Sequence, residues 1–169
     1  DLLDERPVLF PQVKGARFAV ATGLNARREH VARCLGVPRQ CLIGAMRSAL
    51  QNPAYPPVVN RAACQEVFEA QVELRDLPIL LHLPNDGGPY ISAGVAIVRD
   101  PELGRNLSFH RMMRLDQRRL AVRLVEGRGT HTALQRAGGK LEVAICIGNS
   151  PAVLLAAATS PAPGFDELA

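Results

Sequence analysis

The sequence lacks the long apolar run that a membrane-spanning helix needs. No stretch of about 18 uncharged apolar residues occurs, although 47% of the 169 residues are hydrophobic. The first residues also lack a basic region followed by an apolar segment, which is the pattern of a secretory signal. We therefore expect a protein without a membrane span, located in the cytoplasm.

Several enzyme and redox motifs are missing as well. The chain has no Gly-x-Ser-x-Gly nucleophile elbow, no Walker loop and no internal repeat, so neither a hydrolase, a P-loop protein nor a solenoid is favoured. No CxxC spacing occurs among the four cysteines, which argues against a disulfide framework and fits a reducing compartment. Cys34 and Cys146 occupy apolar positions, and we predict that they are buried free thiols.

Lysine is scarce, so arginine supplies nearly all of the positive charge. Lys and Arg total 20 against 16 Asp and Glu, which gives a net charge of +4. The arginines are scattered along the chain, and this spread argues against a nucleic-acid-binding stripe. Arginine suits bidentate binding of carboxylate or phosphate in a site, but a compositional bias of the genome explains the same usage equally well.

The first part of the chain has the pattern of a strand-loop-helix unit. We predict a strand at 16–23 and then a helix that Asn25 caps and Gly36 ends. A second helix is predicted at 39–50, and the proline-rich segment 52–57 is typical of a surface loop.

The sequence pattern changes near Asp76, from a mixed pattern to strand-like and loop-like segments, and we predict a domain boundary there. A strand is expected at 79–83, followed by a loop at 84–89 that is rich in Pro, Asn, Asp and Gly. The preceding segment 60–74 has a mixed pattern that leaves its class open. Its core candidates are Val67, Phe68, Val72 and Leu74.

The second half alternates strand-like and helix-like segments. Three β-compatible runs joined by short turns predict an antiparallel meander, at 90–99, 106–115 and 119–125. A short helix, a strand and a final helical segment follow, at 130–136, 141–147 and 153–158. The fold class expected is therefore α/β (α+β).

Polar side chains alternate along the run that begins at Asn106. The period of two places Asn106, Ser108 and His110 on one face of the strand. The amide of Asn106 can offer an oxygen to a hard divalent cation, and Arg111 can bind phosphate or carboxylate through its planar fork. Taken alone, an ordinary solvated strand face is the simpler interpretation.

A second polar cluster runs from Arg123 to His131. Its Gly-Arg-Gly turn would expose backbone N–H groups beside Arg128, an arrangement that can hold a phosphate. Taken alone, a plain structural turn is the favoured interpretation. His131 and His82 lack a metal-like histidine partner. We expect hydrogen-bonded core or capping histidines rather than ligands.

The order of several motifs resembles the UbiD family. An early part is similar to the N-terminal domain of that family, namely Pro7 to Gly15 and Asn25 to Gly36. The more specific motifs follow in the order and approximate spacing of the family: Leu77-Pro-Ile-Leu80, Asp86-Gly-Gly-Pro-Tyr-Ile91, Asp100-Pro-Glu-Leu-Gly104, Asn106-Leu-Ser-Phe-His-Arg-Met112 and Ala157 to Leu168.

The resemblance implies two domains and an activity. It implies an N-terminal α/β domain at 1–76 and, at 77–169, part of a split β-barrel that holds a flavin. The implied reaction is the reversible, non-oxidative decarboxylation of an aromatic or α,β-unsaturated carboxylic acid with prenylated FMN. A flavin prenyltransferase would supply the cofactor, and a homo-oligomer is the implied assembly.

The resemblance also implies site residues. Asn106 matches a ligand of a divalent metal, commonly Mn²⁺, with K⁺ as a further implied ion. Arg111 matches a residue that binds both the cofactor and the substrate carboxylate, and it is our candidate catalytic residue. The implied cofactor contacts are Phe109, His110, Arg111, Arg123, Leu124, Val125, Arg128 and Gly129.

Two departures from the family pattern affect these expectations. Some relatives carry a metal-ligating histidine near the position of Gly129, whereas the nearest histidine here is His131. The sequence also stops at Ala169, before the region where relatives carry an acidic metal ligand and the catalytic carboxylates, so we expect a piece of a longer protein. A non-catalytic flavin-binding or assembly module, or a scaffold domain, remains the alternative function.

Overall fold

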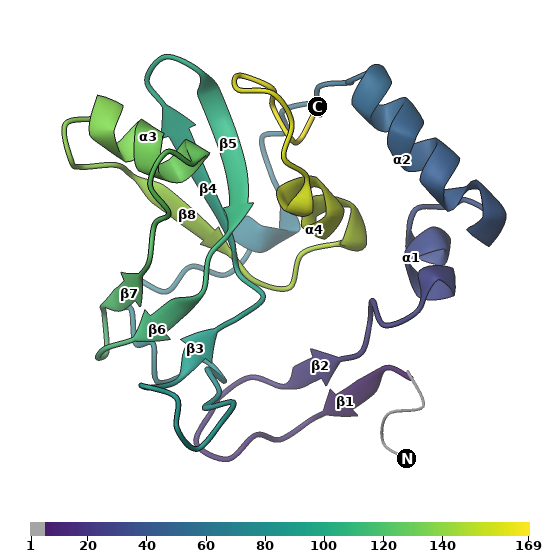
Figure 1. The fold of residues 1–169 in the computed structure, drawn as a ribbon. Coiled ribbons are helices and arrows are strands. Elements are labelled where there is room, and N and C mark those ends of the chain that lie inside the picture. The colour runs from purple at the N-terminus through teal and green to yellow at the C-terminus, as the bar shows by residue number, and fades with distance from the viewer. Residues whose placement is uncertain (1–5) are drawn as a thin grey trace.

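Three small antiparallel sheets make up the β structure of the computed structural model, which describes residues 6–169 (Figure 1). The first pairs β1 (Val8–Phe10) with β2 (Val20–Thr22). The second has the order β3 (Tyr90–Ile91), β6 (Met112–Arg114), β7 (Leu120–Val122). The third has the order β5 (Gly104–Phe109), β4 (Val95–Asp100), β8 (Val143–Cys146).

Short helices connect and cover these sheets. In chain order they are α1 (Arg28–Cys34), the 3-10 turn η1 (Arg39–Cys41), α2 (Leu42–Gln51), the 3-10 turn η2 (Ala63–Gln65), α3 (Gly129–Arg136) and α4 (Pro151–Ala158). The last helix begins as expected for a capped helix, because the Ser150 hydroxyl accepts a hydrogen bond from the Val153 N–H and proline follows it. The fold is therefore mixed α/β with antiparallel sheets, as predicted.

The main core lies where α3 and α4 cover opposite faces of the sheet around β4 (Figure 1). Val95 and Leu107 of adjacent strands pack with Ala157 of α4, and all three are buried. On the other face Ala133 of α3 has no exposed surface. Burying each such Val or Leu side chain contributes about 1.5–3 kcal/mol, so these residues help to hold β4, β5 and α4 together.

The predicted three-strand meander is wrong in its connections. The run 90–99 forms two strands, interrupted at 92–94, where Gly94 lies so close to the Ile91 side chain that an added Cβ would lie 2.8 Å from Ile91 Cγ2. The run 106–115 is likewise interrupted at His110 and Arg111. The strands therefore belong to two sheets, with β4 and β5 paired in one and β6 and β7 in the other.

The first helix begins later than predicted. Arg27, rather than Asn25, is the N-cap of α1, and no side chain caps the helix, because Asn25 lies in the preceding turn. The predicted end at Gly36 is confirmed by its φ of 67°, a conformation that glycine adopts without strain. The second helix and the loop after it are also confirmed.

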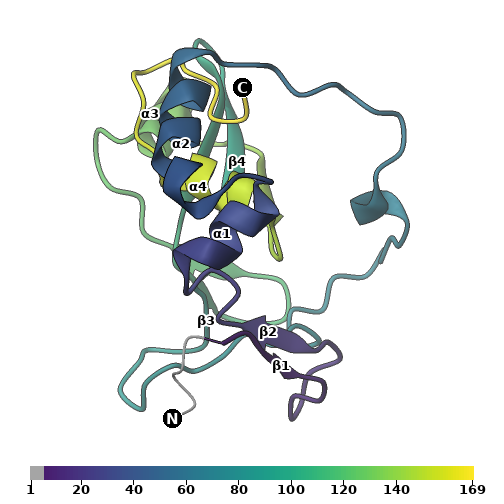
Figure 2. The same cartoon turned by 90° about the vertical axis from the view of Figure 1, so that its right-hand side faces the viewer.

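The segment between α2 and β3 forms a long excursion with little regular structure, which stands away from the sheets in Figure 2. Phe68 is 87% exposed and Val67 77% exposed, so these predicted core residues are wrong, and so is the exposed Val72. Leu74 alone of this group is half-buried. The predicted strand at 79–83 is reduced to one bridge between Leu80 and Tyr90, because no neighbouring strand in the described part of the chain continues the pairing.

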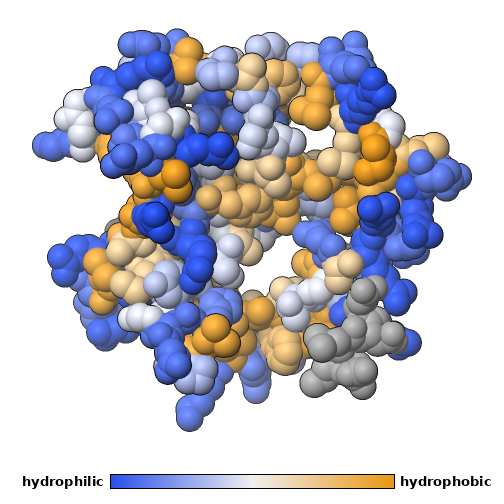
Figure 3. Space-filling view, in the orientation of Figure 1, coloured by the Kyte–Doolittle hydropathy of each residue, from blue (hydrophilic) through white to orange (hydrophobic). Residues whose placement is uncertain are grey.

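The cysteine prediction is wrong for Cys34, which is exposed, since the seven-residue α1 buries only Ala32. Cys146 is half-buried, and both thiols are free. No helix within residues 6–169 is both long enough and apolar enough to cross a bilayer. Apolar residues instead gather in the middle of the face drawn in Figure 3, over α4.

Candidate cofactor-binding site

A triangle of polar groups joins β5 to the start of α3. The Nε2 atom of His110 lies 2.9 Å from Ser108 Oγ and 3.0 Å from Thr130 Oγ1, and the two hydroxyl oxygens are 3.0 Å apart. Nε2 carries either one hydrogen or one lone pair, whereas each hydroxyl has one hydrogen and two lone pairs. The three contacts therefore leave some lone pairs of the hydroxyl oxygens unused. Thr130 is only 9% exposed. The triangle therefore fixes this junction and still has hydrogen-bonding capacity for a ligand.

Strand alternation explains why these side chains meet. β5 pairs with β4 over six residues, with Asn106 opposite Val98 and Ser108 opposite Ala96. Leu107 between them faces α4. The polar face predicted for Asn106, Ser108 and His110 is therefore the face that α3 covers.

Asn106 lies directly against Gly129, the first residue of α3. An added Cβ at Gly129 would collide with Asn106 Oδ1, so only glycine leaves room for the amide. The Nδ2 atom of Asn106 is buried and has no hydrogen-bond partner among residues 6–169. A buried amide nitrogen without a partner costs free energy. The described neighbours of Asn106 do not supply a hydrogen-bond acceptor that would offset this cost.

His110 is kept neutral by its surroundings. Burial lowers the pKa of His110 below its ordinary value of 6.5, because the charged ring loses hydration there. No acidic group contributes to the shift. Burial therefore favours the neutral ring.

The two residues on either side of His110, Phe109 and Arg111, are exposed. Phe109 is 39% exposed, and Arg111 is exposed at the break between β5 and β6. The Arg111 guanidinium lies over the ring of Tyr90, with Cζ 5.0 Å from the ring centroid. Among residues 6–169 no carboxylate forms an ion pair with Arg111.

The second predicted cluster forms the turn that leads into α3. The Arg128 N–H donates to the Val125 carbonyl over 3.2 Å, and Gly127 has a φ of 73°, which closes the turn. Arg123, Val125 and Arg128 are exposed, and Leu124 is half-buried. Within residues 6–169, no hydrogen bond or ion pair links Arg123 or Leu124 to the triangle.

The histidines are hydrogen-bonded, as predicted. His131 Nδ1 accepts from the Gly127 N–H over 3.3 Å, so it braces the turn before α3. His82 Nε2 lies 3.4 Å from the Tyr90 carbonyl, but its side chain is exposed rather than in the core. No group of three His, Cys, Asp or Glu side chains that could hold a metal occurs in the described part of the chain.

Three members of the site were not assigned a role from the sequence. Thr130 follows Gly129, and only its hydroxyl contact with β5 reveals its importance. Tyr90 lies within the Gly-Gly-Pro-Tyr motif, but its proximity to Arg111 depends on the pairing of β3 with β6. Ser108 could have been found from the period of two, which already placed it beside Asn106.

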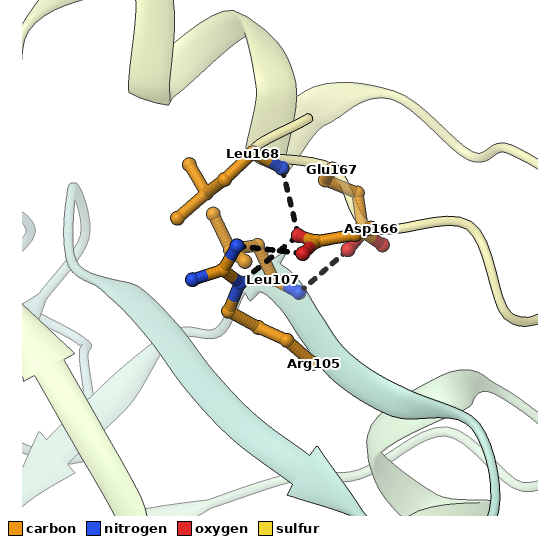
Figure 4. A network of polar contacts seen from close by, with 5 residues as sticks. All are labelled: Arg105, Leu107, Asp166, Glu167 and Leu168. Carbon is orange, nitrogen blue, oxygen red and sulfur yellow. Dashed lines mark hydrogen bonds and ion pairs between the residues drawn. The ribbon is translucent and has the colours of Figure 1, made fainter. Parts of the chain in front are cut away.

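A separate polar network fastens the end of the chain to β5 (Figure 4). Arg105 makes two bonds to Asp166, and the Leu107 N–H donates to Glu167 Oε2 over 3.1 Å. The Arg105 hydrogen bond holds the pKa of Asp166 below its ordinary value of 3.8, whereas burial raises the pKa of Glu167 above 4.5. This network positions the strand that carries Asn106 and is not itself part of the candidate site.

Comparison with known proteins shows close relatives. The chain is 40% identical over 174 residues to the anhydromevalonate phosphate decarboxylase of Methanothermobacter thermautotrophicus, an alignment that covers 99% of this chain and 40% of that protein. The chain thus spans about two fifths of the length of this curated relative.

Solved structures agree with this relationship. The UbiD-class enzyme HmfF from Pelotomaculum thermopropionicum, in an evolved dimeric form in complex with prFMN, superposes with a TM-score of 0.86 at 36% identity, over 95% of this chain and 39% of that one. The 3,4-dihydroxybenzoic acid decarboxylase from Enterobacter cloacae gives a TM-score of 0.80 at 31% identity, over 96% and 36%.

The family model that matches is the UbiD 3-octaprenyl-4-hydroxybenzoate carboxy-lyase Rift-related domain, over residues 57–169. This range includes the triangle, Asn106, Arg111 and the turn before α3. It covers well over half of the chain. The chain therefore belongs to the UbiD carboxy-lyase family.

Proposed function

We propose that this chain forms the cofactor-binding part of a decarboxylase that acts on an aromatic or α,β-unsaturated carboxylic acid with prenylated FMN and a divalent metal. The observation that carries the proposal is the buried, unsatisfied amide of Asn106 beside Gly129. The same residues belong, within the proposal, to a split β-barrel domain that begins near Asp76.

The Asn106 amide suits a hard cation. Rotation of the terminal amide by about 180° exchanges its nitrogen and oxygen atoms. The oxygen would then occupy the buried position that has no hydrogen-bond partner, where it could accept from a donor or bind a cation. A cation such as Mn²⁺, or K⁺, satisfies such an oxygen. We therefore assign Asn106 to the metal, with the remaining ligands supplied from outside the described residues.

The start of α3 suits a phosphate. The N–H groups of the first helical turn lack partners within the helix, and the helix dipole favours an anion there. Gly129 opens α3 against Asn106, and Arg128 precedes it as the N-cap. We propose that Arg128 and the N–H groups of this turn bind the cofactor phosphate next to the metal, with Arg123, Leu124 and Val125 as further contacts.

The end of β5 suits the reacting part of the site. The prenylated flavin, when bound, serves as the electron sink for loss of carbon dioxide. Phe109 and His110 would contact the flavin, and the neutral His110 ring contributes a hydrogen bond without a charge. Arg111 would bind the substrate carboxylate through its fork and orient the bond that breaks.

The experiment uses the full-length protein co-produced with a flavin prenyltransferase. We expect a flavin absorption band, a bound cofactor of prenylated-FMN mass, and carbon dioxide release from one of a panel that includes anhydromevalonate phosphate and 3,4-dihydroxybenzoate, the acids named for the relatives above. Flavin binding without turnover of any acid would favour the non-catalytic module. Protein that carries no flavin-like species contradicts both.

A matched pair of variants tests Asn106. Asn106→Ala should lose most of the bound metal, measured by elemental analysis, and most of the flavin. Asn60→Ala, in an exposed part of the long excursion, should lose neither. Equal metal and flavin contents in the two variants would remove Asn106 from the site.

A further inference from the structure

We propose that Tyr90 is a positioning residue for Arg111, whose guanidinium rests on the Tyr90 ring and keeps its N–H donors available for a carboxylate. The inference rests on the proposed function of Arg111. It extends that function to Tyr90 of β3, which precedes Arg111 by 21 positions in the sequence.

The contact between the two side chains is electrostatic but uses no hydrogen bond. Arg111 Cζ lies over the Tyr90 ring, 5.0 Å from its centroid. The negative face of an aromatic ring attracts a guanidinium at this distance. Because the attraction acts through the face of the ring, the five N–H donors of Arg111 are not consumed by it.

Two other arginines near this sheet, Arg105 of β5 and Arg136 of α3, are held differently. Arg105 spends two donors on Asp166, and Arg136 bonds to Asp100 and Glu102. These pairs neutralise the cation, so neither guanidinium is free to bind an anionic ligand. Among residues 6–169, Arg111 forms no ion pair with a carboxylate, and the contact that holds its guanidinium is the Tyr90 ring.

Tyr90 is itself firmly placed. Its N–H donates to the Leu80 carbonyl over 2.9 Å, and it lies opposite Met113 in the pairing of β3 with β6. Its side chain is half-buried. Arg111 comes just before β6, at the break in the strand, where a long exposed side chain would otherwise sample many rotamers. A fixed ring beside it restricts that freedom without neutralising the charge.

The structure contains a matched control. Arg17 Cζ lies 5.7 Å from the centroid of the Phe18 ring, which is a second contact of the same kind. Phe18 is 46% exposed and lies outside the cluster formed by β5, β6 and α3. Arg17 also pairs with Glu69 at 2.9 Å. Loss of the Phe18 ring should therefore not affect carboxylate binding.

The test compares Tyr90→Leu, Tyr90→Phe and Phe18→Leu in the full-length, flavin-loaded enzyme. Binding of benzoate is measured by calorimetry, and kcat and KM are measured with an acid that the wild type decarboxylates. Tyr90→Leu should weaken benzoate binding and raise KM by about two- to fivefold. Tyr90→Phe should match the wild type, because the ring remains, and Phe18→Leu should also match it.

A double-mutant cycle separates positioning from a general structural effect. In an Arg111→Ala background, Tyr90→Leu should cause no further loss of benzoate affinity. The same two- to fivefold loss in that background would overturn the inference. Tyr90→Val, which suits a strand, serves as the ring-free variant if Tyr90→Leu does not fold.

The outcomes distinguish this inference from the proposed function. A flavin-loaded wild type that binds no carboxylate overturns the role of Arg111, and the inference falls with it. A wild type that binds benzoate, together with a Tyr90→Leu variant that binds it equally well, overturns the inference alone.

Discussion

Arg105 and Asp166 form a two-bond ion pair that joins β5 to a segment 61 residues later (Figure 4), with Nε–Oδ1 and Nη2–Oδ2 distances of 2.9 and 2.6 Å. The adjoining Glu167 accepts from the Leu107 N–H. β5 is an edge strand, and these contacts occupy polar groups that its outer side would otherwise present to solvent. The end of the chain thus protects the strand that carries Asn106.

Replacement of the ion pair should lower stability measurably. Arg105→Ala leaves the Asp166 carboxylate, whose side chain is 17% exposed, without its guanidinium. We expect a loss of about 1–2 kcal/mol in the free energy of unfolding, measured by urea denaturation. Arg119→Ala breaks an exposed fork with Asp116 and should cost under about 0.5 kcal/mol. Equal losses would show that burial of the pair is unimportant.

Glu167→Gln should stabilise the protein at neutral pH. Burial raises the pKa of Glu167 above 4.5, so the folded state holds its proton more tightly than the unfolded state. The stability associated with the protonated form is therefore lost as the pH rises through the folded pKa. Glutamine keeps an acceptor for the Leu107 N–H. The variant should have a higher Tm than the wild type at pH 7 and a similar one below pH 4.5; a constant difference across this range contradicts the assignment.

Acidification should destabilise the protein through His110. Burial lowers its folded pKa below 6.5, so between the two values the unfolded state binds more protons and stability falls as the pH drops. His110→Gln should flatten the dependence of the free energy of unfolding on pH just below 6.5. Chemical denaturation at a series of pH values measures it, and an unchanged slope would contradict the role given to burial.

Gly129→Ala should harm the site although alanine favours helices. Its Cβ would displace the Asn106 amide, so we expect a lower Tm and loss of bound flavin and metal. Gly44→Ala is the control, because Gly44 lies within α2 with open space around it. That change should stabilise the protein by up to about 1 kcal/mol. Similar gains in both variants would show that Asn106 moves aside without consequence.

Local features of the sequence predicted much of the second half. The short helix predicted at 130–136 is confirmed by α3, and the two glycines that follow it have positive φ, 69° at Gly138 and 86° at Gly139. The period of two predicted that Asn106, Ser108 and His110 share a face. These predictions succeed because backbone conformation and strand alternation depend on neighbouring residues.

Burial of isolated apolar residues was less predictable. Phe68 and Val67 look like core residues by composition, yet they are exposed on the long excursion because no described element packs over them. Conversely, Thr130 is polar and is buried by the contact of α3 with β5. The hydropathy of a residue indicates how much free energy its burial would contribute. Whether the residue is buried depends on which elements the tertiary fold packs over it.

The sequence by itself determined the family, the antiparallel α/β character and the polar face of the strand at Asn106, since ordered motifs and alternation are properties of the chain. Only the tertiary structure decided that Thr130 completes the triangle with Ser108 and His110, and that Tyr90 lies beneath Arg111. These contacts depend on which strands pair and which helix covers them, and such long-range pairing is set by the packing of the whole sheet rather than by any local pattern.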